Sequence, residues 1–366
     1  MPRLSFFLLF LLSSGSLLAF RIVHCVMQES PWYADTDGDG LGDATTVMLS
    51  HAPPVGFVAN AHDADDTDGS GNCDHIKDSF TLNLDPSSCT GPTPQNNEFQ
   101  MIVDRENEWR IIYSNSIPNH PTGSFPNANN PNRIRPQRRT YRFPLNPQTH
   151  THQTSLVAEG HPTHTFGVLL NGVELDPIAA EWFGQREVHQ RHNAVWNKSA
   201  LSAHIDLGED CNNAHVQPSG KYHYHGVPTG YLKQLAVDGT RMVKIGYAGD
   251  GFPIYYKYIY AADGQGIVPA GSSYRLKWAI RGGDGRTAPD GCPDGTYVQD
   301  YEYRAEWGPL DECNGMWGKT PEQPREYFYV VTDNWPSSPM CFSGQPSRDF
   351  ALPPRGHHPR PHRRIR

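Results

Sequence analysis

Three histidines in one short stretch have the spacing to bind a metal ion. The sequence Pro218-Ser219-Gly220 predicts a three-residue hairpin loop, because proline presets the turn and glycine accepts the left-handed backbone that such loops need. That loop places His215 opposite His223, and the alternation of side chains along a strand puts His225 on the same face. Directly opposed residues lie about 4.5–5.5 Å apart at Cβ. We therefore predict that His215, His223 and His225 converge on one ion, zinc or copper.

Acidic residues near this stretch are candidates to orient the histidines or to act as a base. Glu209 and Asp210 precede the hairpin, and Asp250 lies in a later Asp-Gly pair that equally suits a plain turn. Two alternatives stay open for the histidines themselves. They can bond to neighbouring strands in a purely structural role, and a one-residue slip of the register would remove His215 from the set.

Other catalytic chemistries have little support in the sequence. No G-x-S-x-G nucleophile motif occurs. The adjacent carboxylates of Asp311 and Glu312 would point to opposite sides of a strand, which does not suit a glycosidase. A second H-x-H pair, His150 and His152, lacks the cysteine flanked by histidines of a multicopper oxidase and is interpreted as a surface feature.

A second candidate metal site consists of eight aspartates between residues 35 and 68, a stretch without lysine or arginine. The first aspartates follow the spacing of a calcium loop, but Thr46 stands where an EF-hand has glutamate. Carboxylates at this density repel one another unless cations bind. Calcium is therefore the expected ion, with a disordered acidic linker as the alternative. The expected ligands are Asp35, Asp37, Asp39, Asp43, Asp63, Asp65, Asp66 and Asp68.

The composition of the 366-residue chain favours an exported, mostly β protein. Its 34 glycines, 32 prolines and many aromatic residues favour short strands joined by tight turns. A formal net charge of −8 indicates no basic surface for nucleic acid. Residues 1–19 have the layout of a secretory signal peptide, and their apolar run is too short for a membrane span. We expect a secreted protein, or a periplasmic or cell-surface one in a bacterium, with an extracellular partner.

Seven cysteines without a C-x-x-C pair predict disulfide bonds and not a zinc ribbon. Cys25, beside the signal peptide, is expected to be the unpaired one. The other six allow fifteen pairings. The local pairs that we expect are Cys73–Cys89 and Cys313–Cys341.

Turn dipeptides divide residues 98–346 into short runs of β-favouring residues. This pattern predicts one large sandwich-like or irregular barrel domain, with a helix only over residues 177–183. We expect a small irregular calcium-stabilised segment at residues 32–69, a linker at residues 70–97, and a disordered basic tail at residues 347–366.

Several motifs follow one another within residues 98–346, namely Asn119-His120-Pro121, Asn171-Gly172-Val173, His215-Val216-Gln217-Pro218, Tyr222-His223-Tyr224-His225, Gly249-Asp250-Gly251-Phe252-Pro253 and Asp311-Glu312-Cys313-Asn314-Gly315. With these motifs the domain resembles the YHYH-domain family. The resemblance implies export and association with other extracellular modules, and it implies no particular activity. The acidic segment resembles thrombospondin type 3 repeats.

Two classes of function are therefore open. In the first, the protein is a calcium-binding extracellular module with a binding or structural role. In the second, it is a secreted metalloenzyme that uses His215, His223 and His225.

Overall fold

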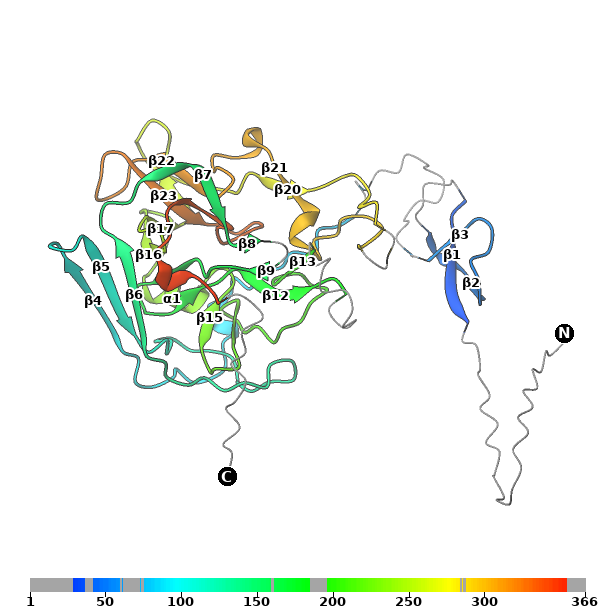
Figure 1. The fold of residues 1–366 in the computed structure, drawn as a ribbon, viewed down its shortest axis with the longest axis horizontal. Coiled ribbons are helices and arrows are strands. Elements are labelled where there is room, and N and C mark those ends of the chain that lie inside the picture. Colours follow the sequence, from blue (N-terminus) through cyan, green and yellow to red (C-terminus); the bar gives the residue numbers. More distant parts are fainter. Residues whose placement is uncertain are drawn as a thin grey trace, which may run out of the picture. The chain divides into compact units, whose positions relative to one another are not determined.

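The structure is a computed structural model that describes residues 29–36, 42–59, 61, 73, 76–158, 161–184, 196–283, 285 and 288–353. The chain divides into two compact units, Met1–Thr67 and Asp68–Arg366. The expected mostly β fold class is confirmed: the described residues form many short strands and almost no helix (Figure 1).

The first unit is a three-stranded antiparallel sheet in the order β2-β1-β3. Its strands are β1 (Ser30–Ala34), β2 (Asp43–Ser50) and β3 (Phe57–Val58). Gly56, with φ of +74°, makes the turn before β3 and accepts a hydrogen bond from the N–H of Asp35 at its carbonyl.

An eight-stranded mixed sheet organises the second unit. Two neighbouring pairs, β11 with β15 and β17 with β23, are parallel, and the other pairs are antiparallel. In sheet order the strands are β14 (Ala214–Val216), β15 (Tyr222–Tyr224), β11 (Glu174–Leu175), β10 (Gly167–Leu169), β16 (Lys244–Ala248), β17 (Pro253–Tyr256), β23 (Glu326–Val331) and β22 (Gly315–Gly318).

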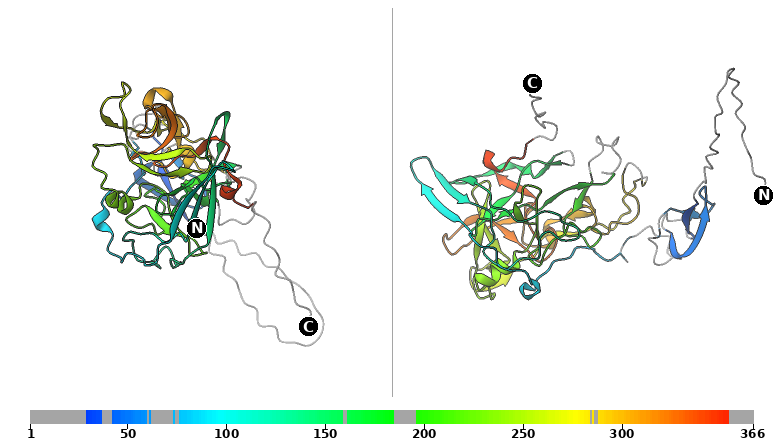
Figure 2. Two further views of the ribbon diagram at one scale, coloured as in Figure 1. Left: turned by 90° about the vertical axis from the view of Figure 1, so that its left-hand side faces the viewer. Right: turned by 90° about the horizontal axis from the view of Figure 1, so that it is seen from below.

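Smaller sheets surround this one. The hairpin of strands β4 and β5 projects at the edge of the unit (Figure 1 and Figure 2). The smaller sheets are β4 (Phe99–Asp104) with β5 (Trp109–Ser114) and β6 (Arg139–Pro144), β7 (Thr149–Ser155) with β24 (Cys341–Gly344), β8 (Val157–Ala158) with β9 (His161–Pro162), β12 (Ile178–Trp182) with β13 (Asn197–Ser199), β18 (Tyr258–Tyr260) with β19 (Ile267–Pro269), and β20 (Tyr274–Leu276) with β21 (Tyr301–Tyr303).

The helical elements are few and short: α1 (Thr229–Gln234) and the 3₁₀ turns η1 (Pro86–Ser88), η2 (Val298–Asp300), η3 (Ala305–Trp307) and η4 (Arg348–Phe350). Within the described residues, none is long and apolar enough to cross a membrane. The expected helix over residues 177–183 is wrong, because Ile178–Trp182 forms strand β12 and pairs with β13. An isolated helix of this length is unstable in water, so the pairing with β13 decides the conformation of this segment. Helix α1 was not expected.

The three disulfides of the described residues link distant parts of the second unit. Cys313–Cys341 is confirmed, whereas the expected Cys73–Cys89 pair is wrong, since Cys73 bonds to Cys292 and Cys89 to Cys211. The Cys73 N–H also donates to the carbonyl of Trp278, which shows that this cysteine docks on the later chain. Cys25 lies outside the described residues.

Two of these disulfides fasten the described part of the expected linker, residues 70–97, to later parts of the second unit. The side chain of Asn213 also holds the backbone of the segment, because it donates its amide to the Asn83 carbonyl and accepts from the Asn83 N–H, both at 2.8 Å. These contacts make the segment part of the domain's packing.

Loss of Cys89–Cys211 should cost more stability than loss of Cys313–Cys341, because the two pairs close loops of very different length, with sequence separations of 122 and 28. A longer loop leaves more freedom to the unfolded chain when the bond is removed. We expect Cys89→Ala/Cys211→Ala to lower the free energy of unfolding by about 2–5 kcal/mol. Equilibrium urea denaturation measures the change, with Cys313→Ala/Cys341→Ala as the matched control. An equal or larger loss in the control would contradict the prediction.

Candidate metal centre

The hairpin of β14 and β15 has the predicted register. His215 pairs with His223, flanked by Ala214 with Tyr224 and Val216 with Tyr222. The loop is closed by the Gln217 N–H to the Lys221 carbonyl, 2.9 Å, and by the Gly220 N–H to the Gln217 carbonyl, 2.8 Å. Gly220 takes the expected left-handed conformation, with φ of +90°.

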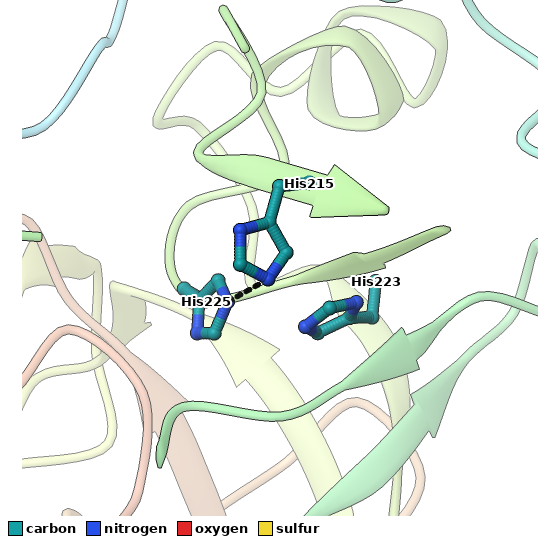
Figure 3. Close-up of side chains that lie close together, drawn as sticks. All are labelled: His215, His223 and His225. Atoms are coloured by element: carbon teal, nitrogen blue, oxygen red, sulfur yellow. Dashed lines mark hydrogen bonds between the residues drawn. The ribbon is translucent and has the colours of Figure 1, made fainter. Parts of the chain in front are cut away.

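The three histidine side chains point toward one another from this hairpin (Figure 3). Their ring centroids are 4.7–4.8 Å apart, and one nitrogen from each ring lies within 4.8 Å of the others. The closest pair is His215 Nε2 and His225 Nε2, at 3.2 Å. Both His223 and His225 are 2% exposed, and His215 is half-buried.

Neighbouring groups orient His215 and set its tautomer. Its Nδ1 lies 3.1 Å from the Leu207 carbonyl and 3.8 Å from Glu209 Oε1, so Nδ1 carries the proton that it donates to the carbonyl. The lone pair is then on Nε2, which faces the other two rings. A backbone carbonyl bonded to the outer nitrogen is the usual support of a metal-binding histidine.

Burial keeps the three imidazoles neutral. It lowers the pKa of His215 below its ordinary value, and it lowers the pKa of His223 and His225 well below it, with further lowering by the neighbouring histidines. The neutral imidazole is the form that binds a metal. Burial also raises the pKa of Glu209 to about 7.

The histidines lie at the wall of a cavity of about 280 Å³. The opposite walls come from residues 129–132 and from β12, including Glu181. Asn130 and Asn132 hold the first of these segments in place, because both donate their side-chain amides to the Val216 carbonyl, at 3.0 and 2.8 Å. The cavity gives a ligand access to the cluster.

Several buried polar atoms around the cluster have no hydrogen-bond partner among the described residues. They are Nδ1 of His223, Nδ1 of His225, Oε1 of Glu209 and Oδ1 of Asp176. Each unpaired buried group costs about 1–3 kcal/mol. Such a concentration of unsatisfied atoms is typical of a site that receives a polar ligand or ion.

Asp176 was not singled out from the sequence. Its N–H donates to the Tyr224 carbonyl at 2.8 Å, which places it beside the histidine strand, and burial raises the pKa of its carboxyl to about 7. Glu174 and Asp176 stand two residues apart in an otherwise apolar run. Since residues two apart on a strand share a face, this spacing indicates two charged groups on one face of a buried strand.

A buried ion pair lies beside the histidines. The Lys221 ammonium contacts Oε2 of Glu174, and the Tyr141 hydroxyl donates to Oε1 of Glu174 at 2.5 Å. Lys221 and Glu174 are 3% and 2% exposed. β11 pairs in parallel with β15 so that Glu174 is the partner of His223, and the ion pair therefore braces the strand that carries two histidines.

The other acidic residues singled out from the sequence lie apart from the three rings. Asp210 accepts from the Tyr222 hydroxyl, 2.9 Å, and from the Gly123 N–H, 2.8 Å, which places its carboxylate on the tyrosine side of the hairpin. Asp250 accepts from the Tyr329 hydroxyl at 2.6 Å, in the region of β17 and β23. Three acidic residues were expected to orient the histidines or to act as a base. Of these, Glu209 is the one beside His215.

Two of the eight aspartates expected to bind calcium are described. Asp35 follows β1 and Asp43 begins β2. The Asp43 carboxylate accepts bonds from the hydroxyls of Thr45 and Thr46, both at 2.7 Å, and these bonds lower its pKa. Asp37, Asp39, Asp63, Asp65, Asp66 and Asp68 lie outside the described residues.

The fold and site define a class: a β-rich, disulfide-linked domain whose central hairpin holds a buried cluster of three histidines. A family model for the YHYH proteins matches residues 140–344, a stretch that contains this hairpin. The chain belongs to the YHYH family. No curated protein and no solved structure matches the chain.

The Lys221→Met substitution should destabilise the domain, because it leaves the Glu174 carboxylate buried without its counter-charge. We expect the free energy of unfolding to fall by about 3–5 kcal/mol and to recover in large part in Lys221→Met/Glu174→Gln. Urea denaturation provides the measurement. The control is Lys244→Met. It breaks the ion pair of Lys244 with Glu322, which is more exposed than that of Lys221 with Glu174, and it should cost at most about 1 kcal/mol. Equal stability of the single and double variants would show that the charge of Glu174 is not the cause.

Proposed function

We propose that the YHYH domain binds one transition-metal ion, zinc or copper, through His215, His223 and His225. The observation that supports this most strongly is the convergence of three neutral imidazoles. Two nitrogens bound to one tetrahedral ion at 2.0–2.1 Å lie about 3.3 Å apart, and the Nε2 atoms of His215 and His225 are 3.2 Å apart. Imidazole ligands suit both metals.

The cavity supports a role in which the ion meets a ligand. Three protein ligands leave a coordination position open, as in catalytic and not in closed structural sites. The function that we infer is therefore an extracellular binding module whose ligand is held at the metal. Metal-dependent hydrolysis is the second candidate, favoured by Glu209 and Glu181 near the cavity, either of which suits a base.

Export and calcium binding complete the proposal. Three disulfides suggest an oxidising, extracellular-type environment, and the signal-peptide layout of residues 1–19 accords with it. The aspartates of residues 32–69 are proposed to bind calcium with weak affinity, on the order of 10⁻⁴–10⁻³ M. In this proposal residues 98–346 are the YHYH domain. Of the basic tail expected at residues 347–366, the described part packs on the domain, because Phe350 of η4 is 1% exposed and Asp349 pairs with Arg142.

Purified full-length protein should contain stoichiometric zinc or copper by elemental analysis. His223→Ala and His225→Ala should lose this metal, because each removes one of three ligands, while His152→Ala, an exposed histidine of β7, should keep it. Circular dichroism verifies that the variants are folded. Wild-type protein that neither contains nor takes up either ion on titration would refute the metal site.

Calcium should protect the acidic segment from proteolysis. Neutralising the repulsion of eight carboxylates orders the chain between Asp35 and Asp68, so removal of calcium with a chelator should expose new cleavage sites there. Mass spectrometry of limited digests locates the cuts. The Asp37→Asn/Asp39→Asn variant should be cleaved there even with calcium present. Identical digests of wild-type protein with and without calcium would exclude the ion.

A further inference from the structure

A strip of unpaired positive charge lies beside the histidine cavity. We call residues 133–139 the arginine strip; its four arginines are Arg133, Arg135, Arg138 and Arg139, all exposed. In the part of the chain that the structure describes, none of the four forms an ion pair. The next arginine, Arg142, differs, because it pairs with Asp349 at 3.0 Å. Four unneutralised guanidinium groups in a chain of net charge −8 indicate a surface for an anionic partner.

The arginine strip continues the wall of the cavity. It directly follows residues 129–132, which line the cavity, and it then crosses the loop of the histidine hairpin. The N–H of Arg135 donates to the Gly220 carbonyl at 2.9 Å, and the Gln137 side chain donates to the Ser219 carbonyl at 3.2 Å. The strip is thus fixed to the same loop that sets the positions of the histidines.

A second hollow extends the strip on its other side. A cavity of about 670 Å³ is lined by Arg138 and Arg139 together with the amides of Gln100 and Gln137 and the exposed ring of Tyr113. Guanidinium groups bind carboxylates and sulfates through paired N–H donors, and carboxamides bind hydroxyls. Apart from Phe99 and the Tyr113 ring, the lining of this hollow is polar and offers hydrogen bonds to an anionic chain.

Carboxylates also lie near both hollows. Asp206 accepts from the Asn129 side chain at 2.6 Å, and Glu181 lines the cavity wall. Glu98 is the acidic residue of the second hollow. Residues 133–139 themselves contain four exposed arginines and no carboxylate, so an anionic chain is directed along them.

We propose that the arginine strip binds an acidic polysaccharide, with one anionic group of that chain reaching the histidine cavity. The disulfides suggest an oxidising, extracellular-type environment, where polyanions that a protein can meet include acidic polysaccharides. The strip also lacks exposed apolar side chains other than Pro136 that would select a peptide, since Ile134 packs against the core. Entry into the cavity rests on the proposed metal site, whereas binding to the strip does not.

Binding to immobilised polysaccharide tests the strip. The probes are polygalacturonate, which carries carboxylates, and heparin, which carries sulfates, with polyglutamate as the peptide comparison. The variant Arg133→Gln/Arg135→Gln/Arg138→Gln/Arg139→Gln should bind at least about tenfold more weakly than wild type, because four exposed ion pairs of modest strength are lost together. The matched control is Arg105→Gln/Lys233→Gln/Arg241→Gln/Arg325→Gln, which removes the same charge from other exposed positions and should bind within about twofold of wild type.

The outcomes separate this inference from the metal site. Chelator-treated wild type should still bind the polysaccharide, because the strip needs no metal. If wild type binds the polysaccharide but neither contains nor takes up zinc or copper, the strip is established and the metal site is refuted. Equal binding by the two quadruple variants would overturn the proposal. Tighter binding of polyglutamate than of both polysaccharides, with the same dependence on the four arginines, would also overturn it in favour of an acidic peptide.

Discussion

The register of the β14–β15 hairpin is the constraint on which the rest of the site depends. Its core-facing side chains Val216, Tyr222 and Tyr224 are at most 1% exposed. The tyrosine hydroxyls are also bonded, Tyr222 to Asp210 and Tyr224 to Asn171 and His120. A shift of one residue would turn the histidines into an apolar core and the tyrosines out of it. Burial on one side therefore fixes the geometry of the imidazoles on the other.

Irregular segments around the hairpin are held by carboxamide side chains where strand pairing ends. Asn130 and Asn132 share the Val216 carbonyl, and Asn213, in a left-handed conformation with φ of +52°, donates its amide to Asn83 and Val227. Such bonds satisfy buried backbone groups that no neighbouring strand reaches. The cavity can therefore have walls of non-repetitive chain that still lie in fixed positions.

Local chemistry made much of this hairpin predictable. Proline and glycine favour a three-residue loop here, and the period of two along a strand then assigns each side chain to a face. The pairing of His215 with His223 was therefore predictable, and the structure excludes the one-residue slip that the sequence left open. The match of residues 140–344 to the YHYH family accords with the motifs found there.

The remaining features depend on contacts between distant segments. Nothing near Cys73 in the sequence indicates that it meets Cys292, and Asp176 acquires its place beside the histidines only through the parallel pairing of β11 with β15. The same holds for β12, whose strand conformation depends on its partner β13. Short segments without a strong preference for helix or strand take the conformation that their tertiary contacts favour.

The parallel pairing of β11 with β15 also bears on the order of folding. Glu174 and Lys221 are 47 positions apart, so the strand that braces the histidines arrives by closure of a long loop and not with the hairpin itself. Contacts of this range form slowly, because the entropy of closure is lost before the contacts stabilise the chain. The hairpin is then the early element and the braced cluster the late one. The three histidines are therefore braced against the sheet only when β11 joins the hairpin.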